Sequence, residues 1–542
     1  MHKTKFSARK KRLSDKTVWT IAAVLICMVV AAFSLSFWWL GAYLPLRAEV
    51  DLNTTYQTLT GFGASSAWYW QDMGANASEQ TVERAVNLLY GDEGLMLNIF
   101  RYNIGGGSAD ETLDATVPYS NFGFDTFRRA ESFFVAENVK AEERDDVAAL
   151  CAAFGDESNY DFEGRDVAVR YMLEKALTTG NVDKVVFFVN SPHYLMTESG
   201  TCTGEYARQN NLKAEFYGAF ADYLLIIVHN LYEIYLENLD DVPDVYISPF
   251  NEPQWDWGGP YSTQEGCHYD PQNLAAAADV IWRKLEAFNR ENGTDFRLDL
   301  FECGNYKRYV GDYDYTDYLA ALSGYEWFDD IEYISVHDYG ADDSEYHRRV
   351  FADYLDRHYP NLSVAATEFC EMQPGEFDTI ESGIYLAKVV LRDLTMLDAT
   401  EWSWWLSVAK GTYNDGLVYW NALSPKSDDA ELYMLKRYYT YAQFTRYLGA
   451  GDVRVKCALS DPMNWTGIDI GAFVKPDGRL VVVVINEGPA RRLALKGTER
   501  YIGAVTERTQ TTAEDNLATE SLSFDGTLAL AADSVTTFVF GE

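Results

Sequence analysis

Two short segments of the chain each place a glutamate directly after a run of apolar residues. Glu252 follows residues 245–251, and Glu368 follows residues 363–367. Short apolar runs are typical of buried strands, so each carboxylate is expected at the end of a strand. Glycoside hydrolysis uses two carboxyl groups held in this way, because one protonates the departing sugar oxygen while the other attacks or stabilises the anomeric carbon.

Apolar runs of this kind recur along the chain, and segments with helical spacing separate them. In residues 214–236 and 271–289, for example, apolar residues recur at intervals of three and four. Strands that alternate with helices favour a parallel sheet, and eight such units predict an α/β fold built as a closed (β/α)8 TIM barrel. The expected strands are 58–64, 95–101, 184–190, 245–251, 297–303, 331–337, 363–368 and 400–405.

In that fold the carboxyl ends of the strands line the active site. Besides the two glutamates, other polar or aromatic residues lie at such ends. They are Arg101, Asn190, Asn251, Glu302, His337, Trp402 and Trp405. Glu371 competes for the role of nucleophile, but it lies beyond the expected strand end. Glu302 is expected at the rim of the site or behind it.

Several of these features also have a purely structural interpretation. The Asn-Glu-Pro segment at 251–253 is compatible with an ordinary strand-to-loop turn. Arg101 is compatible with a surface ion pair, and His337 with a core histidine whose hydrogen bonds are satisfied. The glycines at 105–107 lack the Gly-Lys-Ser/Thr ending of a phosphate-binding loop, so we expect a flexible loop beside the pocket.

Short motifs occur along the chain in the order in which a known family carries them. They are residues 61–64 (GFGA), 101–106 (RYNIGG), 190–197 (NSPHYLMT), 251–253 (NEP), 337–339 (HDY), 367–370 (TEFC) and 401–405 (EWSWW). From roughly residue 50 to residue 542, the chain therefore resembles glycoside hydrolase family 30. This retaining family includes glucosylceramidases, β-1,6-glucanases, xylanases and β-1,6-galactanases. Residues 253–257 and 264–267 are most similar to the β-1,6-galactanase subgroup.

The resemblance implies a role for each matching residue. Glu252 matches the general acid/base and Glu368 the nucleophile, which implies retention of the anomeric configuration and carboxyl groups about 5–5.5 Å apart. Asn251 matches a residue that hydrogen-bonds the sugar 2-hydroxyl. Arg101 and Tyr339 match side chains that keep the nucleophile ionised and oriented, since a neighbouring guanidinium lowers the pKa of a carboxylate.

Two further pocket residues follow from the same comparison. His337 matches a polar residue that lines the pocket. Asn190 stands where other subgroups carry a different residue, often an aromatic one. We therefore expect both side chains to contact substrate, and the departure at Asn190 disfavours the specificities of the other subgroups.

Aromatic residues make up 15% of the chain, and some fall in loops or at strand ends that face the expected cleft. A flat aromatic face suits the C–H face of a pyranose. We expect Trp402 and Trp405 to bind substrate, with Trp405 as the sugar platform of the catalytic subsite. Trp255 and Trp257 follow Glu252 closely and are expected to set specificity on the aglycone side. Most other aromatic residues are expected in the core.

The N-terminus has the pattern of a membrane signal anchor. Residues 1–17 carry seven Lys or Arg against a single acid, and residues 18–46 contain no charge. This apolar run exceeds a signal-peptide core of about 7–15 residues and is long enough to cross a bilayer of about 30 Å. We expect a cytoplasmic tail and a catalytic domain at the cell surface. A cleaved signal peptide and a secreted enzyme are the alternative.

The chain changes character after the expected barrel. Residues 58–447 carry the barrel pattern, whereas 448–542 show short strands separated by Gly, Asp, Pro and Asn, which is typical of a β-sandwich. The family resemblance implies that residues 47–57 form a strand that joins this sandwich.

The net charge of −37 disfavours nucleic acid and anionic membranes as partners. The family resemblance implies a neutral polysaccharide or oligosaccharide as the substrate. No cluster of metal ligands and no cofactor motif stands out in the sequence, and we expect neither a metal ion nor a cofactor.

Seven cysteines are too few for a disulfide scaffold at this length. Cys202 and Cys267 fall in neighbouring loops and could pair outside the cell. We expect a monomer.

These observations predict a membrane-anchored retaining glycosidase that acts on β-1,6-galactan, such as the side chains of arabinogalactan. A β-1,6-glucanase or a glucosylceramidase-like enzyme is the alternative within the family. From another class, the chain could be a surface glycan-binding protein that has lost catalysis. The complete set of Arg101, Asn251, Tyr339 and both carboxylates argues against a pure binder, which needs no such set.

Overall fold

The structure is a computed structural model that describes residues 24–29, 46–110, 126–259, 262–309, 311–411, 413–421, 431–460 and 466–541. The basic tail expected at 1–17 and most of the membrane segment expected at 18–46 lie outside these ranges. Within them, no helix has both the length and the apolar character needed to span a bilayer. The signal anchor therefore stays a prediction.

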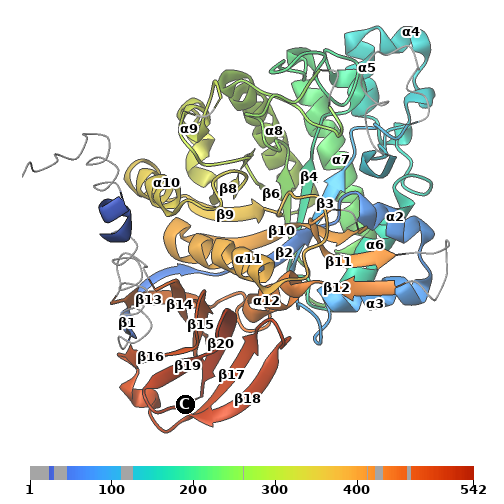
Figure 1. Ribbon diagram of the computed structural model, residues 1–542. Helices are drawn as coiled ribbons and strands as arrows, with labels where there is room; N and C mark the ends of the chain where they lie inside the picture. Colours follow the sequence, from blue (N-terminus) through green and yellow to red (C-terminus); the bar gives the residue numbers. More distant parts are fainter. Residues whose placement is uncertain are drawn as a thin grey trace, which may run out of the picture.

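A ring of parallel strands forms the centre of the larger part of the molecule (Figure 1). The strands are β2 (Gly61–Ser65), β3 (Ile99–Ile104), β4 (Lys184–Val189), β5 (Asp244–Ser248), β6 (Arg297–Leu298), β7 (Glu302–Cys303), β8 (Tyr333–His337), β9 (Ser363–Glu368) and β10 (Ala399–Ala409). Each pairs in parallel with the next, except that β6 and β7 are two pieces of the stretch 297–303, and β10 pairs again with β2. The ring thus has the eight strand positions that the sequence predicts.

Helices lie around the outside of this ring, most of them between consecutive strands (Figure 1). They are α2 (Tyr69–Asn76), α3 (Glu79–Leu89), α4 (Ala141–Arg144), α5 (Val147–Phe154), α6 (Val167–Leu177), α7 (Tyr217–Tyr235), α8 (Pro271–Asn292), α9 (Tyr315–Leu322), α10 (Glu345–His358), α11 (Ile380–Arg392) and α12 (Lys436–Thr445). Local sequence sets their ends. In α8, Pro271 occupies the first turn, where its missing N–H costs nothing, and Gly293 ends the helix with a φ of 72°.

The interior of the ring is closed near the amino ends of the strands. A small apolar cluster there contains Tyr246 and Tyr333, and the buried ammonium of Lys184 lies 4.0 and 4.4 Å from the centres of these two rings. Lys184 also forms a 2.8 Å ion pair with Glu401. Because side chains fill this end, the opposite, carboxyl end is where a site can form.

The second body is a nine-stranded sheet that folds over its own core. Its strands are β1 (Leu46–Thr58), β13 (Val453–Leu459), β14 (Ile468–Val474), β15 (Leu480–Asn486), β16 (Arg491–Lys496), β17 (Val505–Thr511), β18 (Ala518–Ser523), β19 (Thr527–Leu530) and β20 (Ser534–Phe540). The strand expected at 47–57 is β1, which pairs antiparallel with β13 and parallel with β16. β1 and the strands that follow residue 452, far apart in the chain, therefore meet in one sheet.

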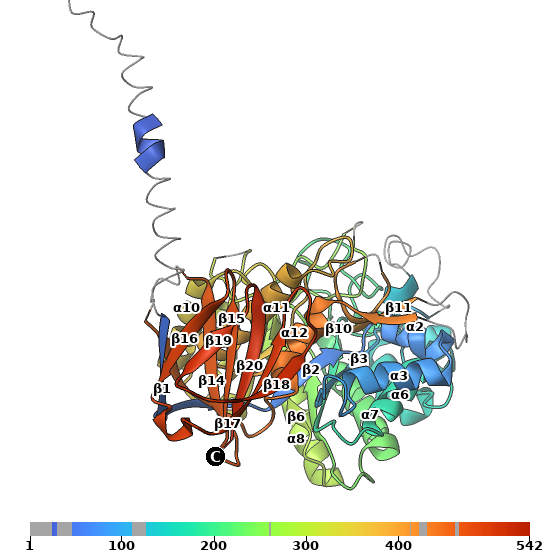
Figure 2. The same cartoon turned by 60° about the horizontal axis from the view of Figure 1, so that its bottom comes forward.

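Figure 2 shows this sheet beside α11 and α12, which lie between it and the ring. Arg392 of α11 forms a 3.1 Å ion pair with Asp469 of β14, and Gln443 of α12 donates a hydrogen bond to Thr511 of β17. A two-stranded hairpin, β11 (Gly416–Asn421) and β12 (Glu431–Met434), extends the ring alongside β10. The loop between β10 and β11 reaches the carboxyl end of the ring.

Candidate active site

A cavity of about 320 Å³ opens at the carboxyl ends of the ring strands. Strand ends and the loops that follow them supply its lining. The lining residues are Trp68, Arg128, Asn190, Asn251, Glu252, Trp255, Trp257, Gln264, Tyr339, Glu368, Cys370, Met372, Trp405, Tyr413 and Asp415. Both predicted carboxylates are among them.

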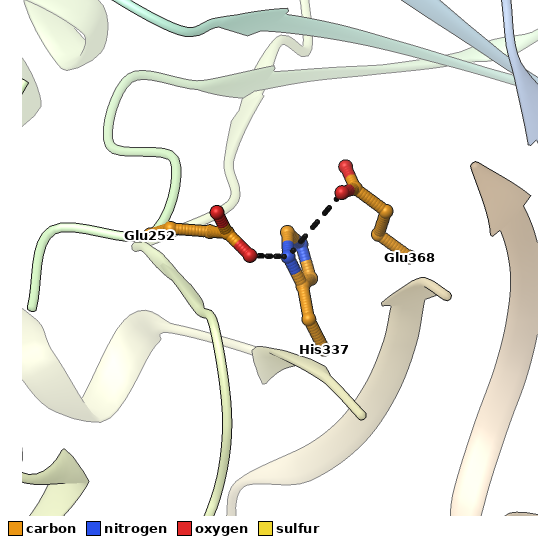
Figure 3. A group of neighbouring side chains, drawn as sticks. All are labelled: Glu252, His337 and Glu368. Atoms are coloured by element: carbon orange, nitrogen blue, oxygen red, sulfur yellow. Dashed lines mark hydrogen bonds and ion pairs between the residues drawn. The ribbon is translucent and has the colours of Figure 1, made fainter. Parts of the chain in front are cut away.

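Figure 3 shows Glu252 and Glu368 on either side of His337. One carboxylate oxygen of each glutamate and one ring nitrogen of His337 all lie within 4.8 Å of one another. Nδ1 of His337 is 2.9 Å from Oε1 of Glu252 and 3.7 Å from Oε1 of Glu368. All three side chains are buried, so their charges interact through little water.

Glu302 lies behind the cavity and connects the residues that orient the two glutamates. Its carboxylate accepts hydrogen bonds from Ser248 (2.7 Å), Thr367 (2.8 Å) and Nε2 of His337 (3.0 Å), and it pairs with Arg101 at 2.5 Å. The side chain is completely buried. Sequence reasoning placed Glu302 at the rim or behind the site, and the structure places it behind.

Arg101 bridges Glu302, which lies behind the cavity, and Glu368, which lines it. Nη2 contacts Glu302, whereas Nη1 lies 3.2 Å from Oε2 of Glu368 and also donates to Ser65. Its guanidinium stacks 4.3 Å above the ring of Phe188. The residue is buried and does not line the cavity, so its contact with the site is through Glu368.

Tyr339 follows the end of β8 and lines the cavity beside Glu368. Its hydroxyl donates a 3.0 Å hydrogen bond to Oε1 of Glu368. Burial raises the pKa of Tyr339 well above its usual value, so the phenol keeps the proton that it donates. Arg101 and Tyr339 therefore hold the two oxygens of Glu368 from different sides.

The environment shifts the pKa of Glu368 upward, to about 7, because burial disfavours its charge and Glu252 and Glu302 add repulsion. His337 and Arg101 act in the opposite direction but do not prevail. The expectation that Arg101 keeps this carboxylate ionised is therefore only half right. Arg101 lowers the pKa of Glu368, but the effect of burial is larger.

His337 is held as a cation by the acids around it. Burial acts to lower the pKa of His337, but the charge of Glu368 and the hydrogen bonds to Glu252 and Glu302 raise it to about 10. Burial acts to raise the pKa of Glu302, but Arg101 and His337 keep it well below its usual range. Both ring N–H groups of His337 can then donate, one to Glu252 and one to Glu302.

Glu252 adopts a backbone conformation that few non-glycine residues adopt. Its φ is 46°, in the left-handed region, although the next residue is Pro253. Three hydrogen bonds hold this turn: Glu252 N–H donates to Glu302 O (2.8 Å), and Trp255 N–H (3.1 Å) and Trp257 Nε1 (2.9 Å) donate to Glu252 O. The turn directs the carboxylate to a fixed place on the cavity wall.

Two asparagines present unpaired acceptors at the cavity. Oδ1 of Asn190 and Oδ1 of Asn251 are buried and have no hydrogen-bond partner in the structure. Nδ2 of Asn190 donates to Asn103 at 3.1 Å, which fixes the direction of the amide. Buried acceptors without a partner are costly, so these oxygens are suited to accept hydrogen bonds from a bound molecule.

Three of the predicted tryptophans line the cavity, and glycines opposite two of them allow the close fit. A Cβ on Gly304 would lie 2.1 Å from Nε1 of Trp255, and one on Gly266 would lie 2.4 Å from the ring of Trp257. Trp405 packs edge-on against Trp68 with ring centres 5.1 Å apart. The cavity thus has aromatic walls.

Trp402 is not at the cavity, contrary to the sequence expectation. It is fully buried, and its indole N–H donates to Asp393 at 2.8 Å, on the outer side of the ring. Side chains on a strand alternate between faces, so residues 402 and 405 of β10 cannot both face inward. Because Glu401 points inward to Lys184, Trp405 shares its face and Trp402 does not.

Glu371 is not a competing nucleophile in this geometry. Its carboxylate accepts hydrogen bonds from Ser382 (2.7 Å) and Asn414 (2.6 Å) and does not line the cavity.

Cys202 and Cys267 are both buried as free thiols, so the disulfide considered for them is not formed in the structure.

In the described part of the chain, Glu252, His337 and Glu368 lie close enough together to share a metal ion. However, His337 already donates from its ring nitrogens to carboxylates, and Arg101 adds a second positive charge. The protein's own cations therefore balance these carboxylates.

The sequence did not point to several residues of the cavity wall. Arg128, Tyr413, Met372 and Asp415 come from loops outside the recognised motifs. Two other wall residues lie in segments that carry the family resemblance: Gln264 in the segment 264–267 and Cys370 in the motif 367–370.

Comparison with known proteins agrees with this geometry. Residues 45–419 match the model of O-glycosyl hydrolase family 30, and residues 451–538 match the β-sandwich domain of the same family. The chain is 25% identical, over 82% of its length and 82% of the relative, to an endo-β-1,6-galactanase of Hypocrea rufa. It is 29% identical, over 37% of its length and 15% of the relative, to an exo-β-1,6-galactobiohydrolase of Bifidobacterium longum.

A solved structure shares the fold. A conserved exported protein from Bacteroides fragilis superposes with a TM-score of 0.74 at 22% identity, covering 91% of this chain and 100% of the other. Because the family model covers most of the chain and the two carboxylates face one cavity, the chain belongs to glycoside hydrolase family 30 and is an O-glycosyl hydrolase.

Proposed function

We propose that this protein hydrolyses β-1,6-linked galactan, such as the side chains of arabinogalactan, with retention of the anomeric configuration. One observation carries the stereochemical part: a carboxylate oxygen of Glu252 and one of Glu368 lie within 4.8 Å of each other. Retaining enzymes hold their carboxyl groups about 5–5.5 Å apart, whereas inverting enzymes need about 6.5–9.5 Å to admit a water molecule.

Glu368 is the nucleophile in this mechanism. Its carboxylate attacks the anomeric carbon and forms a covalent glycosyl-enzyme, while Tyr339 and Arg101 hold its two oxygens. Substrate that displaces water from the cavity strengthens these contacts. The attack requires an ionised Glu368. His337 and Arg101 favour this form, because their positive charges lower its pKa.

Glu252 is the general acid and then the general base. It gives its proton to the departing sugar oxygen and later takes one from the water that releases the sugar. His337 donates to Glu252 and balances the negative charge that remains after the first step. The fixed turn at Glu252 aims the same carboxyl group in both steps.

The substrate class rests on two independent supports. The two curated relatives are named for action on β-1,6-galactans. The cavity combines tryptophan faces with the unpaired acceptors of Asn190 and Asn251, which suits a neutral sugar. We further propose that residues 18–46 anchor the enzyme at the cell surface, because the basic segment 1–17 precedes this uncharged run.

The experiment is a comparison of substrates with full-length protein purified in detergent. β-1,6-galactan, β-1,6-glucan, xylan and glucosylceramide are incubated separately, and new reducing ends and product sizes are measured, with Glu368→Gln as the control. Galactan cleavage that the variant loses supports the proposal, and the product sizes distinguish endo from exo action. Cleavage of another substrate alone overturns the specificity. Binding of galactan without cleavage of any substrate overturns the activity.

A further inference from the structure

Asp415 is a carboxylate on the cavity wall that the mechanism above does not use. It lies in the loop between β10 and β11 and is only 5% exposed. Its Oδ1 atom has no hydrogen-bond partner in the structure, although the residue borders the same cavity as Glu368. A buried carboxylate oxygen without a partner is costly, which requires an explanation.

The backbone around Asp415 is held from behind, away from the cavity. Trp404 Nε1 donates a 2.6 Å hydrogen bond to the carbonyl oxygen of Asp415, and the guanidinium of Arg437 donates to the carbonyl oxygen of Asn414. The side chain of Asn414 donates to Glu371 at 2.6 Å. These contacts hold the loop in place without using Oδ1. The carboxylate is therefore preorganised to accept a hydrogen bond from a bound molecule.

Asp415 lies on the Glu368 side of the cavity. The loop that carries it is bonded to the segment that follows Glu368, since Asn414 N–H donates a 2.9 Å hydrogen bond to Gln373 O. Trp405, on β10, is tied to the same segment by a 2.9 Å hydrogen bond to Phe369 O. Trp255 and Trp257 follow Glu252 instead. In a retaining reaction the sugar next to the nucleophile is the glycone.

The chemistry of this corner suits the hydroxyl groups of a neutral sugar. A carboxylate accepts strong hydrogen bonds from hydroxyl donors. The guanidinium of Arg128 lies 4.4 Å above the ring of Trp68 and donates to Thr263 at 3.0 Å, and both Arg128 and Trp68 line the same cavity as Asp415. An acceptor, a cation and an aromatic face thus line one cavity.

We propose that Asp415 is a substrate-binding residue that accepts hydrogen bonds from hydroxyl groups of the glycone sugar and selects sugars by the positions of those groups. This inference rests on the proposed function, because it places the glycone beside Glu368. Asp415 takes no part in the transfer of protons or of the glycosyl group.

The test compares the full-length wild type with Asp415→Asn and Asp415→Ala. The substrates are β-1,6-galactotetraose and β-1,6-glucotetraose, which differ in the orientation of one hydroxyl on each sugar. We expect kcat/KM on galactotetraose to fall about tenfold to hundredfold, since a hydrogen bond to a charged group is lost. We also expect the ratio of kcat/KM between the two substrates to move toward one. Glu376→Gln is the matched control, because this exposed carboxylate bonds Tyr433 at 2.7 Å outside the cavity.

Asparagine has the size of aspartate and leaves the loop's backbone contacts in place, so a folded Asp415→Asn variant is expected. The inference is overturned if both variants keep kcat/KM within twofold of the wild type. It is also overturned if activity falls only in proportion to a loss of folded protein, with the substrate ratio unchanged.

The two proposals can fail separately. If the wild type cleaves neither tetraose, the proposed substrate is wrong. The role of Asp415 is then decided by titrating Glu368→Gln, with and without Asp415→Asn, with xylotetraose and both β-1,6-linked tetraoses. Weaker binding of whichever sugar binds supports the role, and equal binding by both proteins, or no binding of any of the three, overturns it.

Discussion

Arg101 places Nη2 2.5 Å from Oε2 of Glu302, a carboxylate that never reaches the cavity. This ion pair supports both catalytic glutamates. Nη1 of the same guanidinium contacts Glu368, and the same carboxylate of Glu302 accepts a hydrogen bond from His337. One buried pair therefore connects the supports of both catalytic glutamates. Removing either partner would leave the other buried with one compensating charge fewer.

Replacing the catalytic glutamates should separate their two roles. Glu252→Ala is expected to lower kcat on natural substrate by about 10²- to 10⁴-fold, the usual contribution of acid–base catalysis. On an aryl galactoside whose leaving group departs without protonation, added azide should restore turnover and yield a β-glycosyl azide, because a small nucleophile needs no general base. Glu368→Gln should be inactive in the same assay. Proton NMR of the products gives the anomer, and an α product from the wild type would contradict the retaining mechanism.

Loss of Arg101 should destabilise the fold as well as the site. Arg101→Met leaves Glu302 buried with one cation fewer, which is expected to reduce the free energy of unfolding by about 3–5 kcal/mol. Urea unfolding followed by tryptophan fluorescence measures this change. Arg208→Met is the control, since Arg208 pairs with Asp256 and Asp312 at the surface and should have little effect. Equal urea midpoints for the two variants would show that the buried ion-pair network does not stabilise the fold.

The acidic limb of the plot of kcat/KM against pH should reflect the titration of Glu368. Its pKa is raised to about 7, and only the ionised form can attack, so kcat/KM should fall as the pH decreases below about 7. His337 lowers the pKa of Glu368, so His337→Gln should move this limb to higher pH. His229→Gln, on the outer helix α7, should leave the profile in place. A limb that stays fixed or moves down in His337→Gln would exclude this assignment.

Gly304 should tolerate no side chain. A Cβ there would lie 2.1 Å from Nε1 of Trp255, so Gly304→Ala must displace the indole from the cavity wall. We expect a higher KM with a smaller change in kcat, measured on oligosaccharides that reach past the cleaved bond. Gly218→Ala on α7 is the matched control, because its nearest neighbour is 3.6 Å away and alanine favours the helix. Unchanged kinetics in Gly304→Ala would remove Trp255 from substrate binding.

The two tryptophans of β10 should behave in opposite ways. Trp405→Phe is expected to raise KM with little change in stability, since the residue lines the cavity. Trp402→Phe removes the donor to Asp393 and is expected to cost about 1–3 kcal/mol of unfolding free energy, with little change in KM. Urea unfolding and steady-state kinetics on the same preparations measure both effects. The reverse pattern would contradict the assignment of the two faces.

The local pattern of the sequence was enough to place the main chemistry. Glu252 and Glu368 each follow an apolar run, and a short apolar run is a strand signal that needs no knowledge of distant residues. Their convergence follows from the rule that parallel strand ends meet at one face of the barrel. The direction of Trp402 was missed, because it depends on the register of β10 against its neighbours, which no local pattern reveals.

The sequence by itself determined the eightfold alternation of strands and helices and the two carboxylates. These are local properties of spacing and residue type. Only the tertiary structure decided that Glu302 lies beneath the site, that burial raises the pKa of Glu368, and that Asp415 reaches the cavity wall. Each of these three features depends on groups more than thirty residues apart in the chain and on how much water folding removes from between them. No local stretch of sequence therefore predicts them.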